Sequence, residues 1–430
     1  MSQVPAQSYY QATAPVTRQP EPLEGRHEVQ VAVVGGGFAG LNTALGLAER
    51  GMRDVRLLEA KRIGHGASGR NGGFVFAGYS LGEAALVRQL GAERARSLFA
   101  RTVDAVQRIR ERVAAYAIDC DLVHAGVLWA NWFRDPRVLR ERQHLLQEHF
   151  GIRWEWLPQA QLREHLHTSR YSDALFERHA MHLHPLKYAQ GLAQAARGQG
   201  VHVHEDSAVL DLQRDGHGWR VRTHGGELHA RHVVLACGGY LAGLEPRVDR
   251  AVLPIATYVM VTEPLGERLH QAIATDSAVY DTRFAFDYYR KLAEGRLLWG
   301  GRISVRNRSP QDVERLLRRD LARVYPQLAD ARVDYAWSGL MSYARHQMPQ
   351  VGGDGQGLWW AQAFGGHGLA PTAVAGELLA EAIAEGASDW RALERFGLVS
   401  AWRPLGYLAA QASYSWLQAR DAWKEWRERR

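Results

Sequence analysis

Two features near the N-terminal end of the sequence could hold a nucleotide, one by its phosphates and one by its ribose. The run Gly35-Gly36-Gly37-Phe38-Ala39-Gly40 has the spacing G-x-G-x-x-G, and Glu59 follows at the end of a later apolar run. Backbone N–H groups of a glycine turn bind pyrophosphate oxygens, and a carboxylate after the next strand accepts hydrogen bonds from ribose hydroxyls. We therefore expect a dinucleotide to bind here.

The elements around this turn are those that would position it. Residues 31–34 form an apolar run before the glycines, residues 41–48 carry apolar side chains at helical spacing, and a second apolar run ends at Glu59. Strand, glycine turn, helix and strand together predict a βαβ unit. The three spaced glycines would permit, in order, the tight turn, the approach of the pyrophosphate and the close packing of helix on strand.

A second pattern of strand, glycine turn and helix stands near the C-terminal end. Residues 358–364 are mostly apolar and predict a strand, Gly365-Gly366-His367-Gly368 forms the turn, and residues 371–384 have helical spacing. In the middle of the chain, the strand candidate 231–235, apolar from Val233 on, also ends in small residues, at Ala236-Cys237-Gly238. This order predicts a cofactor domain assembled from N-terminal, middle and C-terminal pieces, with a β-rich substrate domain inserted between them.

The composition is typical of a globular protein with two domains. Of 430 residues, 46% are hydrophobic and 23% are charged, and no apolar run is long enough to span a bilayer. The N-terminal end lacks the features of a secretory signal, and the two cysteines, Cys120 and Cys237, fit a reducing cytoplasm. The net charge of +7 is spread over expected helical faces, so no nucleic acid partner is expected.

Eight segments in a fixed order extend these patterns over most of the chain. They are GGGFAGL, EAKRIGHGASGRNGG, HLHPLKYAQGLA, VVLACGGYL, DYYR, RLLWGGR, MPQVG and FGGHGLAPT. In this order they resemble the FAD-dependent oxidoreductases of the D-amino-acid oxidase, glycine oxidase and sarcosine oxidase superfamily. Within it, Ser8-Tyr9-Tyr10 and Ile118-Asp119-Cys120-Asp121 are most similar to the γ-glutamylputrescine oxidoreductase group. The resemblance covers about residues 8–425.

The resemblance implies an α/β (α+β) fold, with a Rossmann-like FAD-binding domain of the glutathione-reductase type and an inserted β-rich substrate domain. The expected divisions are an N-terminal arm (1–26), a discontinuous FAD-binding domain (27–85, 178–250 and 345–390), a substrate domain (86–177 and 251–344) and a C-terminal helical tail (391–430).

The resemblance also implies FAD as the cofactor, held by residues from all three pieces of its domain. The ADP half would lie against Gly35, Gly37, Phe38, Ala39, Gly40, Glu59, Ala60, Lys61, Val209, Cys237 and Gly238. The pyrophosphate and the near side of the flavin would lie against Ser68, Gly69, Arg70, Asn71, Gly72 and Gly73, and the ribityl and pyrimidine side against Gly365, Gly366, His367, Gly368 and Leu369.

Two departures from the sarcosine-oxidase pattern affect these expectations. Those enzymes attach FAD through a cysteine in the segment that here reads Leu340-Met341-Ser342-Tyr343-Ala344, so FAD is expected to be non-covalent. They also place a carboxylate-binding lysine where this chain has Ala370. A substrate carboxylate would therefore need a different partner.

The implied reaction is oxidation of a C–N bond, in which a hydride passes from a substrate carbon to the flavin and an imine forms. Arg302, Arg345 and His346 are the candidates for holding a substrate carboxylate, because guanidinium groups bind carboxylates in a bidentate way. Each arginine could instead form an ion pair between domains. Tyr258 and Tyr288 could hydrogen-bond the substrate or be ordinary sheet aromatics.

These basic residues favour a small secondary amino acid such as L-pipecolate or L-proline as the substrate, as in an L-pipecolate oxidase of lysine catabolism. The alternatives are γ-glutamylputrescine or another polyamine-derived amine, and, more distantly, a tRNA-modifying flavoprotein. Either O₂ or a respiratory-chain acceptor would take up the electrons.

Two remaining features concern metals and the C-terminal tail. The pairs His182/His184 and His202/His204 have no cysteine or carboxylate at ligand spacing, so no metal site is expected. The tail mixes Trp416, Trp423 and Trp426 with basic residues. We expect a helix docked on the cofactor domain of a cytoplasmic protein, and peripheral contact with the inner face of the cytoplasmic membrane is the alternative.

Overall fold

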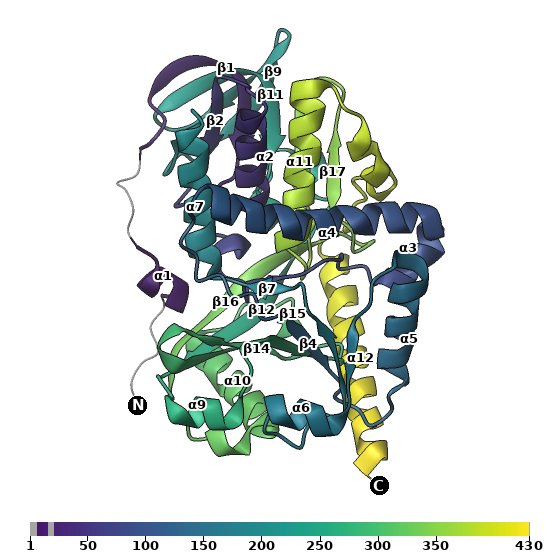
Figure 1. The fold of residues 1–430 in the computed structure, drawn as a ribbon. Helices are drawn as coiled ribbons and strands as arrows, with labels where there is room; N and C mark the ends of the chain where they lie inside the picture. Colours follow the sequence, from purple (N-terminus) through teal and green to yellow (C-terminus); the bar gives the residue numbers. More distant parts are fainter. Residues whose placement is uncertain (1–6, 16–20, 430) are drawn as a thin grey trace.

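Two eight-stranded sheets organise the chain, and they stand one above the other in Figure 1. The computed structural model describes residues 7–15 and 21–429. Of the predicted N-terminal arm, residues 1–6 and 16–20 lie outside the described residues. The described part of the arm contains helix α1 (Tyr9–Thr13), whose Tyr9 and Tyr10 pack in one cluster with residues of the second sheet.

The first sheet contains the predicted βαβ unit. Strand β1 pairs in parallel with β2 on one side and with β11 on the other. Val31, Ala32 and Val33 alternate between the faces of β1 and are all fully buried, so both faces of the sheet are covered there. The strand order is β17 (Gln350–Gly353), β18 (Leu358–Gln362), β11 (Gly226–Leu235), β1 (Gly25–Val34), β2 (Val55–Leu58) and β8 (His202–His204), with β10 (Gly218–Arg222) paired to β11 and β9 (Asp211–Asp215) paired to β10.

Four helices accompany the first sheet: α2 (Phe38–Glu49), α4 (Ala92–Ala115), α7 (Pro185–Gly198) and α11 (Leu369–Glu385). Helices α2 and α11 pack closely, since a Cβ at Gly376 would lie 2.5 Å from the Cβ of Asn42. The sequence division at residue 86 assigns α4 to the substrate domain. The structure differs, because Leu98 and Ile109 of α4 are buried in the same hydrophobic cluster as α2 and α11. Helix α4 runs across the middle of the molecule (Figure 1).

The second sheet forms the other half of the molecule. It is antiparallel except where β13 runs parallel to β4. One face packs on α10 (Pro310–Val324), whose Val313, Leu317 and Leu321 are buried with Trp299 of the sheet. The strand order is β16 (Val333–Tyr343), β12 (Leu253–Thr262), β15 (Arg296–Ser304), β14 (Tyr288–Leu292), β13 (Ala278–Asp281), β4 (Val127–Ala130), β6 (Ala174–Glu177) and β5 (Glu155–Leu157).

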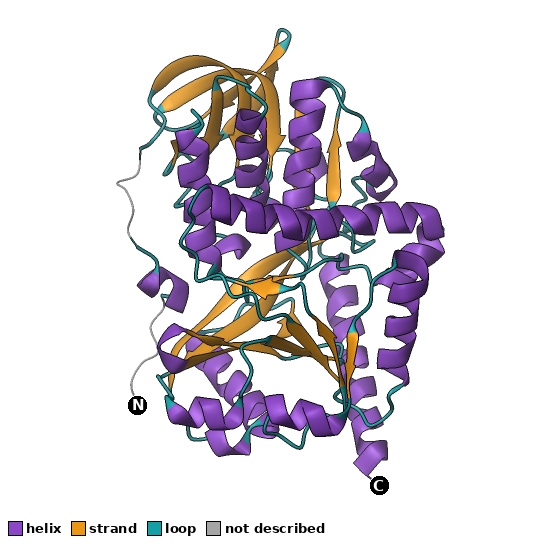
Figure 2. Cartoon of the chain, in the orientation of Figure 1, coloured by secondary structure: helices purple, strands orange, loops and turns teal. Residues whose placement is uncertain are grey.

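Smaller elements connect the two halves, which Figure 2 shows as two groups of strands surrounded by helices. A two-stranded ribbon of β3 (Phe74–Val75) and β7 (Met181–His182) lies between the sheets. The remaining helices are α3 (Glu83–Leu90), α5 (Arg137–Leu145), α6 (Gln159–His165), α8 (Pro246–Asp249) and α9 (Glu267–Ala272), and the short helical turns are η1 (Ala67–Gly69), η2 (Leu146–Phe150), η3 (Gly238–Tyr240), η4 (Ala293–Gly295), η5 (Pro326–Leu328) and η6 (Asp389–Phe396).

The C-terminal helix α12 (Leu405–Arg429) corrects the expectation for the tail, because it lies along the second sheet and not on the cofactor domain. Near its start, Gln411 accepts hydrogen bonds from the Ser304 hydroxyl and the Val305 N–H group at the end of β15. Near its end, Glu425 accepts a hydrogen bond from the Trp132 indole. Tyr407, Ala410 and Tyr414 of α12 also pack in a hydrophobic cluster with Leu253 and Ile255 of β12. These contacts are with residues far away in the chain, so the spacing of tail residues does not reveal them.

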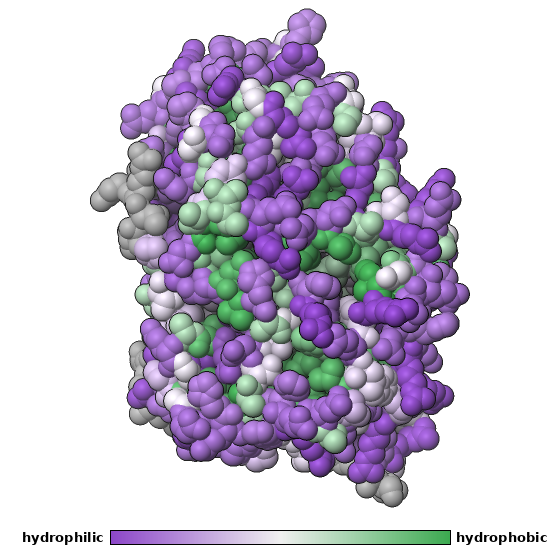
Figure 3. All heavy atoms as spheres, viewed as in Figure 1, coloured by the Kyte–Doolittle hydropathy of each residue, from purple (hydrophilic) through white to green (hydrophobic). Residues whose placement is uncertain are grey.

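The two halves confirm the predicted α/β fold with a parallel, nucleotide-type sheet and a second β-rich half. Hydrophilic side chains cover most of the face seen in Figure 3, and the hydrophobic patches on it are small. Within residues 7–15 and 21–429, no helix is long and apolar enough to cross a membrane.

Candidate active site

The first glycine turn has a backbone that only glycine can adopt without strain. Gly35 has φ +112°, and a Cβ there would lie 2.7 Å from the carbonyl oxygen of Ala236 on the neighbouring strand. A Cβ at Gly40 would overlap the carbonyl oxygen of Gly35. Helix α2 starts directly after Gly37, so its N-terminal N–H groups and its positive dipole end face the cavity described below.

Glu59 lies beside this turn, at the end of β2. One carboxylate oxygen accepts a hydrogen bond from the Gly36 N–H group at 2.7 Å, and the other accepts one from the Lys61 N–H group at 2.9 Å. Burial raises the pKa of Glu59, although these N–H groups act in the opposite direction. These two hydrogen bonds hold the carboxylate beside the glycine turn.

A cavity of about 610 Å³ runs from the glycine turns to the second sheet. Most of the predicted cofactor residues line it: Gly37, Phe38, Ala39, Arg70, Ser68, Asn71, Gly72, Gly73, Cys237, Gly238, Gly365, Gly366, His367, Gly368 and Leu369. Among the described residues, the walls do not include Gly35, Gly40, Glu59, Ala60, Lys61, Gly69 or Val209. All of these except Val209 lie within or beside the segments that line the cavity. Val209 is half-buried and packs against a hydrophobic cluster that includes Leu228 and Val233 of β11.

The glycine turns and the loop of residues 67–73 together form a cradle of backbone along the cavity. The side chains of the loop hold it in place. Asn71 donates from its amide to the carbonyl oxygens of Ala67 and Ser68, and its own oxygen accepts the Gly73 N–H group at 2.8 Å. The Trp337 indole of the second sheet donates to the Arg70 carbonyl at 2.9 Å. This loop is therefore fixed to both halves of the molecule.

The second glycine turn is as crowded as the first. Gly365 has φ +59°, and a Cβ there would lie 2.7 Å from the ring of Tyr343. Gly73 and Gly238 also have positive φ values, +78° and +55°. These glycines therefore bring bare backbone to the cavity wall near the N-terminus of α2, and this geometry fits a dinucleotide cofactor such as FAD.

The far end of the cavity is lined by aromatic side chains, most of them from the second sheet and its loops, with Phe76 following β3 and Tyr414 on α12. These are Phe76, Trp129, Tyr280, Phe284, Phe286, Tyr288, Tyr343 and Tyr414. They meet the glycine end at His367, whose ring lies 4.5 Å from that of Phe76 in an edge-to-face contact. Burial lowers the pKa of His367 to about 4, so its imidazole is neutral near pH 7.

The arginines at this aromatic end are all paired with carboxylates. Arg302 Nε lies 2.7 Å from Asp320 Oδ2, so Arg302 forms an ion pair inside the second half and not between domains. Arg283 pairs with Asp281 at 2.6 Å and also with Asp287. These guanidinium charges are therefore compensated before any substrate enters.

The third arginine of this end, Arg142, pairs with Glu83 at 2.7 Å. Its guanidinium lies between the rings of Trp129 and Trp154, at 4.5 and 4.6 Å from their centres. Such stacking fixes its position as well as its charge.

Three of the predicted substrate residues lie outside the cavity walls. Arg345 is exposed and stacks over the Trp402 ring at 4.9 Å, and His346 packs against Phe396. The Tyr258 hydroxyl donates to the Arg306 carbonyl at 2.6 Å within the core, as expected of a sheet aromatic. The turn after β16 directs residues 345 and 346 toward the C-terminal segment. Of the five predicted residues, only Arg302 and Tyr288 line the cavity.

Sequence reasoning missed several wall residues. Trp129 and Tyr280 lie on paired strands, and Phe284 and Phe286 lie in the loop between β13 and β14. The run RFAFDYYR carried the signal, because an aromatic-rich stretch that is not buried in a core often lines a binding site.

The histidines of the first pair, His182 and His184, have structural partners. His184 Nδ1 accepts the Lys187 N–H group at the start of α7, and His182 Nε2 contacts the Asp276 carbonyl oxygen. Burial lowers their pKa values to about 4 and about 3. Among residues 7–15 and 21–429, no group of three or more His, Cys, Asp and Glu side chains could hold a metal ion.

Comparisons with known proteins identify the family of the chain. The family model for FAD dependent oxidoreductases matches residues 30–382. The chain is 37% identical over 376 residues to gamma-glutamylputrescine oxidoreductase of Escherichia coli (strain K12), covering 87% of this chain and 88% of that protein. It is 26% identical over 369 residues to glycine oxidase of Geobacillus kaustophilus (strain HTA426), covering 83% and 93%.

Solved structures show the same fold. Glycine oxidase from Geobacillus kaustophilus superposes with a TM-score of 0.72 at 23% identity, covering 87% of this chain and 99% of that one. L-proline dehydrogenase from P. horikoshii gives a TM-score of 0.71 at 18% identity, covering 88% and 100%. The resemblance and the FAD cofactor predicted from the sequence are confirmed. The chain belongs to the FAD dependent oxidoreductase family, the D-amino-acid oxidase type of flavoenzyme.

Proposed function

We propose that this flavoenzyme oxidises the C–N bond of an amine that carries no carboxylate on the reacting carbon, such as γ-glutamylputrescine or another polyamine-derived amine. The observation that carries the proposal is the pairing of Arg142, Arg283 and Arg302 with acidic side chains at the aromatic end of the cavity. A substrate carboxylate would have to compete with these partners. The name of the Escherichia coli relative supports the same class of substrate.

This proposal replaces the cyclic amino acid favoured by the sequence. The sequence predicts L-pipecolate or L-proline because Arg302 and Arg345 are its candidates for binding a carboxylate. Arg302 is paired with Asp320, whose side chain is fully buried, and Arg345 lies on Trp402 outside the cavity. Ala370, at the position of a carboxylate-binding lysine in sarcosine oxidases, is also buried in the cavity wall.

The residues of the chain act by binding and orienting the amine. When bound, FAD supplies the hydride acceptor for the carbon next to nitrogen, which leaves an imine. Aromatic faces bind an alkylammonium ion as it enters, and the low polarity of the walls then lowers the amine pKa. Loss of a proton matters because only the neutral amine can release a hydride. Neutral His367, at the junction of the two ends, adds no positive charge that would oppose binding of an ammonium ion.

The test is anaerobic bleaching of the protein-bound flavin. We expect γ-glutamylputrescine or a related alkylamine to bleach the yellow protein far faster than L-pipecolate, L-proline or sarcosine. Bleaching by L-proline or L-pipecolate alone would overturn the proposal in favour of the amino-acid substrate. A colourless protein that binds tRNA would instead favour the tRNA-modifying alternative.

We also propose that the outer face of α12 contacts an anionic membrane surface, so that a respiratory-chain acceptor can take up electrons instead of O₂. Trp416, Trp423 and Trp426 are 64%, 56% and 48% exposed, and their spacing places them on one side of the helix. Arg420 and Arg427 lie over the first two of these rings. Sedimentation with vesicles containing an anionic lipid should carry the protein into the pellet at low salt. Protein that stays in the supernatant would rule this contact out.

A further inference from the structure

Helix α12 lies beyond residues 30–382, which the family model matches, and yet it forms part of the cavity wall. Tyr414 of α12 lines the cavity, and its ring centre lies 5.6 Å from that of Phe284. Tyr414 is therefore placed to touch whatever occupies the aromatic end.

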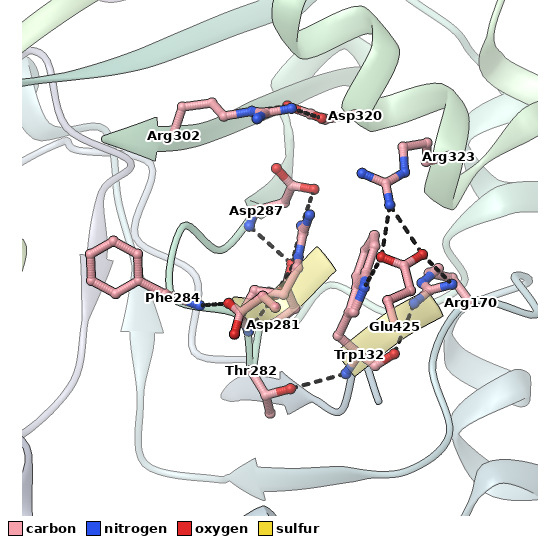
Figure 4. Close-up of polar contacts among 12 residues, drawn as sticks. Trp132, Arg170, Asp281, Thr282, Phe284, Asp287, Arg302, Asp320, Arg323 and Glu425 are labelled. Carbon is pink, nitrogen blue, oxygen red and sulfur yellow. Dashed lines mark hydrogen bonds and ion pairs between the residues drawn. The ribbon is translucent and has the colours of Figure 1, made fainter. Parts of the chain in front are cut away.

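A second residue of α12 holds the loop that carries Phe284. Residues 282–286, between β13 and β14, all line the cavity. At the apex of this loop, Asp421 Oδ2 accepts a hydrogen bond from the Phe284 N–H group at 2.7 Å. Figure 4 shows Phe284 near Asp281 and Thr282 of the same loop. The Asp421 side chain is only 12% exposed, which strengthens a hydrogen bond between a charge and an amide.

The base of the loop is fixed separately. Arg283 pairs with Asp281 and Asp287, and Asp281 also accepts the Asp287 N–H group at 2.9 Å (Figure 4). Between base and apex, Phe286 is 38% exposed and lies against the rings of Tyr280 and Tyr288. The apex thus depends on α12 for a fixed position, whereas the base does not.

Helix α12 itself is anchored one turn further along. Glu425 accepts the Trp132 indole N–H group at 3.1 Å and pairs with Arg323 at 2.9 Å and Arg170 at 3.4 Å (Figure 4). The Arg283 guanidinium lies 3.5 Å from the centre of the same Trp132 ring. Helix and loop are therefore tied to one common side chain.

We propose that α12 is a substrate-positioning element, with Asp421 as the positioning residue and Tyr414 as a residue that determines specificity. Asp421 fixes the Phe284 main chain, so that the aromatic rings of the loop form a stable wall along the alkyl chain of the substrate. Tyr414 sets the width of the cavity at that wall. The inference rests on the proposed amine substrate, while the glycine cradle for FAD is built by other elements.

The test compares two substitutions of one residue. Asp421→Ala removes the acceptor and should raise the KM for the amine about tenfold, with kcat and FAD content nearly unchanged. Asp421→Asn keeps an acceptor oxygen and should restore most of the loss. Ser413→Ala, at an exposed position of the same helix, is the control and should leave KM unchanged. Tyr414→Ala should shift the preference among amines toward bulkier ones.

Hydrogen exchange gives a readout that needs no substrate. The amides of residues 282–286 should exchange faster in Asp421→Ala than in Asp421→Asn or the wild type, while amides of β1 and α2 stay protected. Unchanged exchange and unchanged KM in Asp421→Ala would refute the positioning role. Equal loss of FAD in both Asp421 variants would overturn it too, because α12 would then support the fold as a whole. If no amine bleaches the wild-type flavin, the proposed function fails, and the exchange data still decide whether Asp421 holds the loop.

Discussion

At the scale of single residues, Gly35 is a position where backbone geometry alone should control cofactor binding. Gly35→Ala would place an L side chain at φ +112° with its Cβ 2.7 Å from a backbone oxygen. The strain of about 1–3 kcal/mol, together with an overlap that the backbone cannot relieve, should displace the turn. We expect a folded protein that retains little FAD, measured by its ratio of flavin to protein absorbance. Gly198→Ala, at the end of α7 where a Cβ meets open space, should stay yellow. A yellow Gly35→Ala protein would contradict the assignment of this turn.

Glu177 is a residue whose effect on stability should depend on pH. Its Oε2 atom is buried and, within the described residues, has no hydrogen-bond partner, and burial raises its pKa from 4.5 to about 8. Protonated Glu177 makes its full contribution to the free energy of unfolding below pH 4.5, the ordinary pKa of the group. This contribution is lost as the pH rises through about 8, because the buried side chain must then ionise. Glu177→Gln should therefore raise the melting temperature more at about pH 9 than at about pH 5. Glu155→Gln, an exposed carboxylate on the neighbouring strand, is the control. A larger rise in melting temperature at about pH 5 than at about pH 9 would contradict a raised pKa for Glu177.

At the scale of elements, prediction succeeded where the signal was local. The glycine turn with its flanking apolar runs specified β1, α2 and β2, because sterics and hydrophobic spacing act within a few residues. The position of α12 was mispredicted, since it depends on contacts of Gln411 and Glu425 with distant residues. Arg302 lines the cavity as expected, but Asp320, on another element, compensates its charge. No spacing in one sequence shows such a partner.

Helix α4 illustrates how one buried charge joins three elements. Arg112 is 5% exposed and pairs with Glu49 of α2 at 2.5 Å and Glu377 of α11 at 2.7 Å. Arg112→Ala would remove the most buried guanidinium partner of both carboxylates. Because Arg50 still pairs with Glu377 at 2.9 Å, the free energy of unfolding should fall by about 3 kcal/mol. Arg108→Ala removes a more exposed partner of Glu377 on the same helix and should cost less than about 1 kcal/mol. Urea denaturation of both variants measures the difference, and equal values would show that Arg112 is not a link between helices.

At the scale of the whole molecule, the two sheets divide the work of the cavity. The first sheet and its helices supply the glycine cradle, and the second sheet supplies the aromatic end. The ribbon of β3 and β7 and the bond from Trp337 to Arg70 join them at the cavity. Substitutions in the second half can therefore change substrate specificity without altering the cofactor site. This separation explains why family membership was predictable from glycine motifs while the substrate was not.

Because the cradle draws on stretches of chain that are far apart in sequence, FAD should stabilise the molecule as a whole. At a free FAD concentration about 100 times its dissociation constant, binding should add about 2.7 kcal/mol to the free energy of unfolding. The measurement is a thermal melt of deflavinated protein at increasing FAD concentration, with the midpoint rising steadily. In Gly35→Ala the same rise should require a much higher FAD concentration, because the turn beside Ala236 no longer accepts the pyrophosphate. Gly198→Ala should follow the wild type. A midpoint in the wild type that does not move with FAD would mean that the cradle forms and unfolds independently of its cofactor.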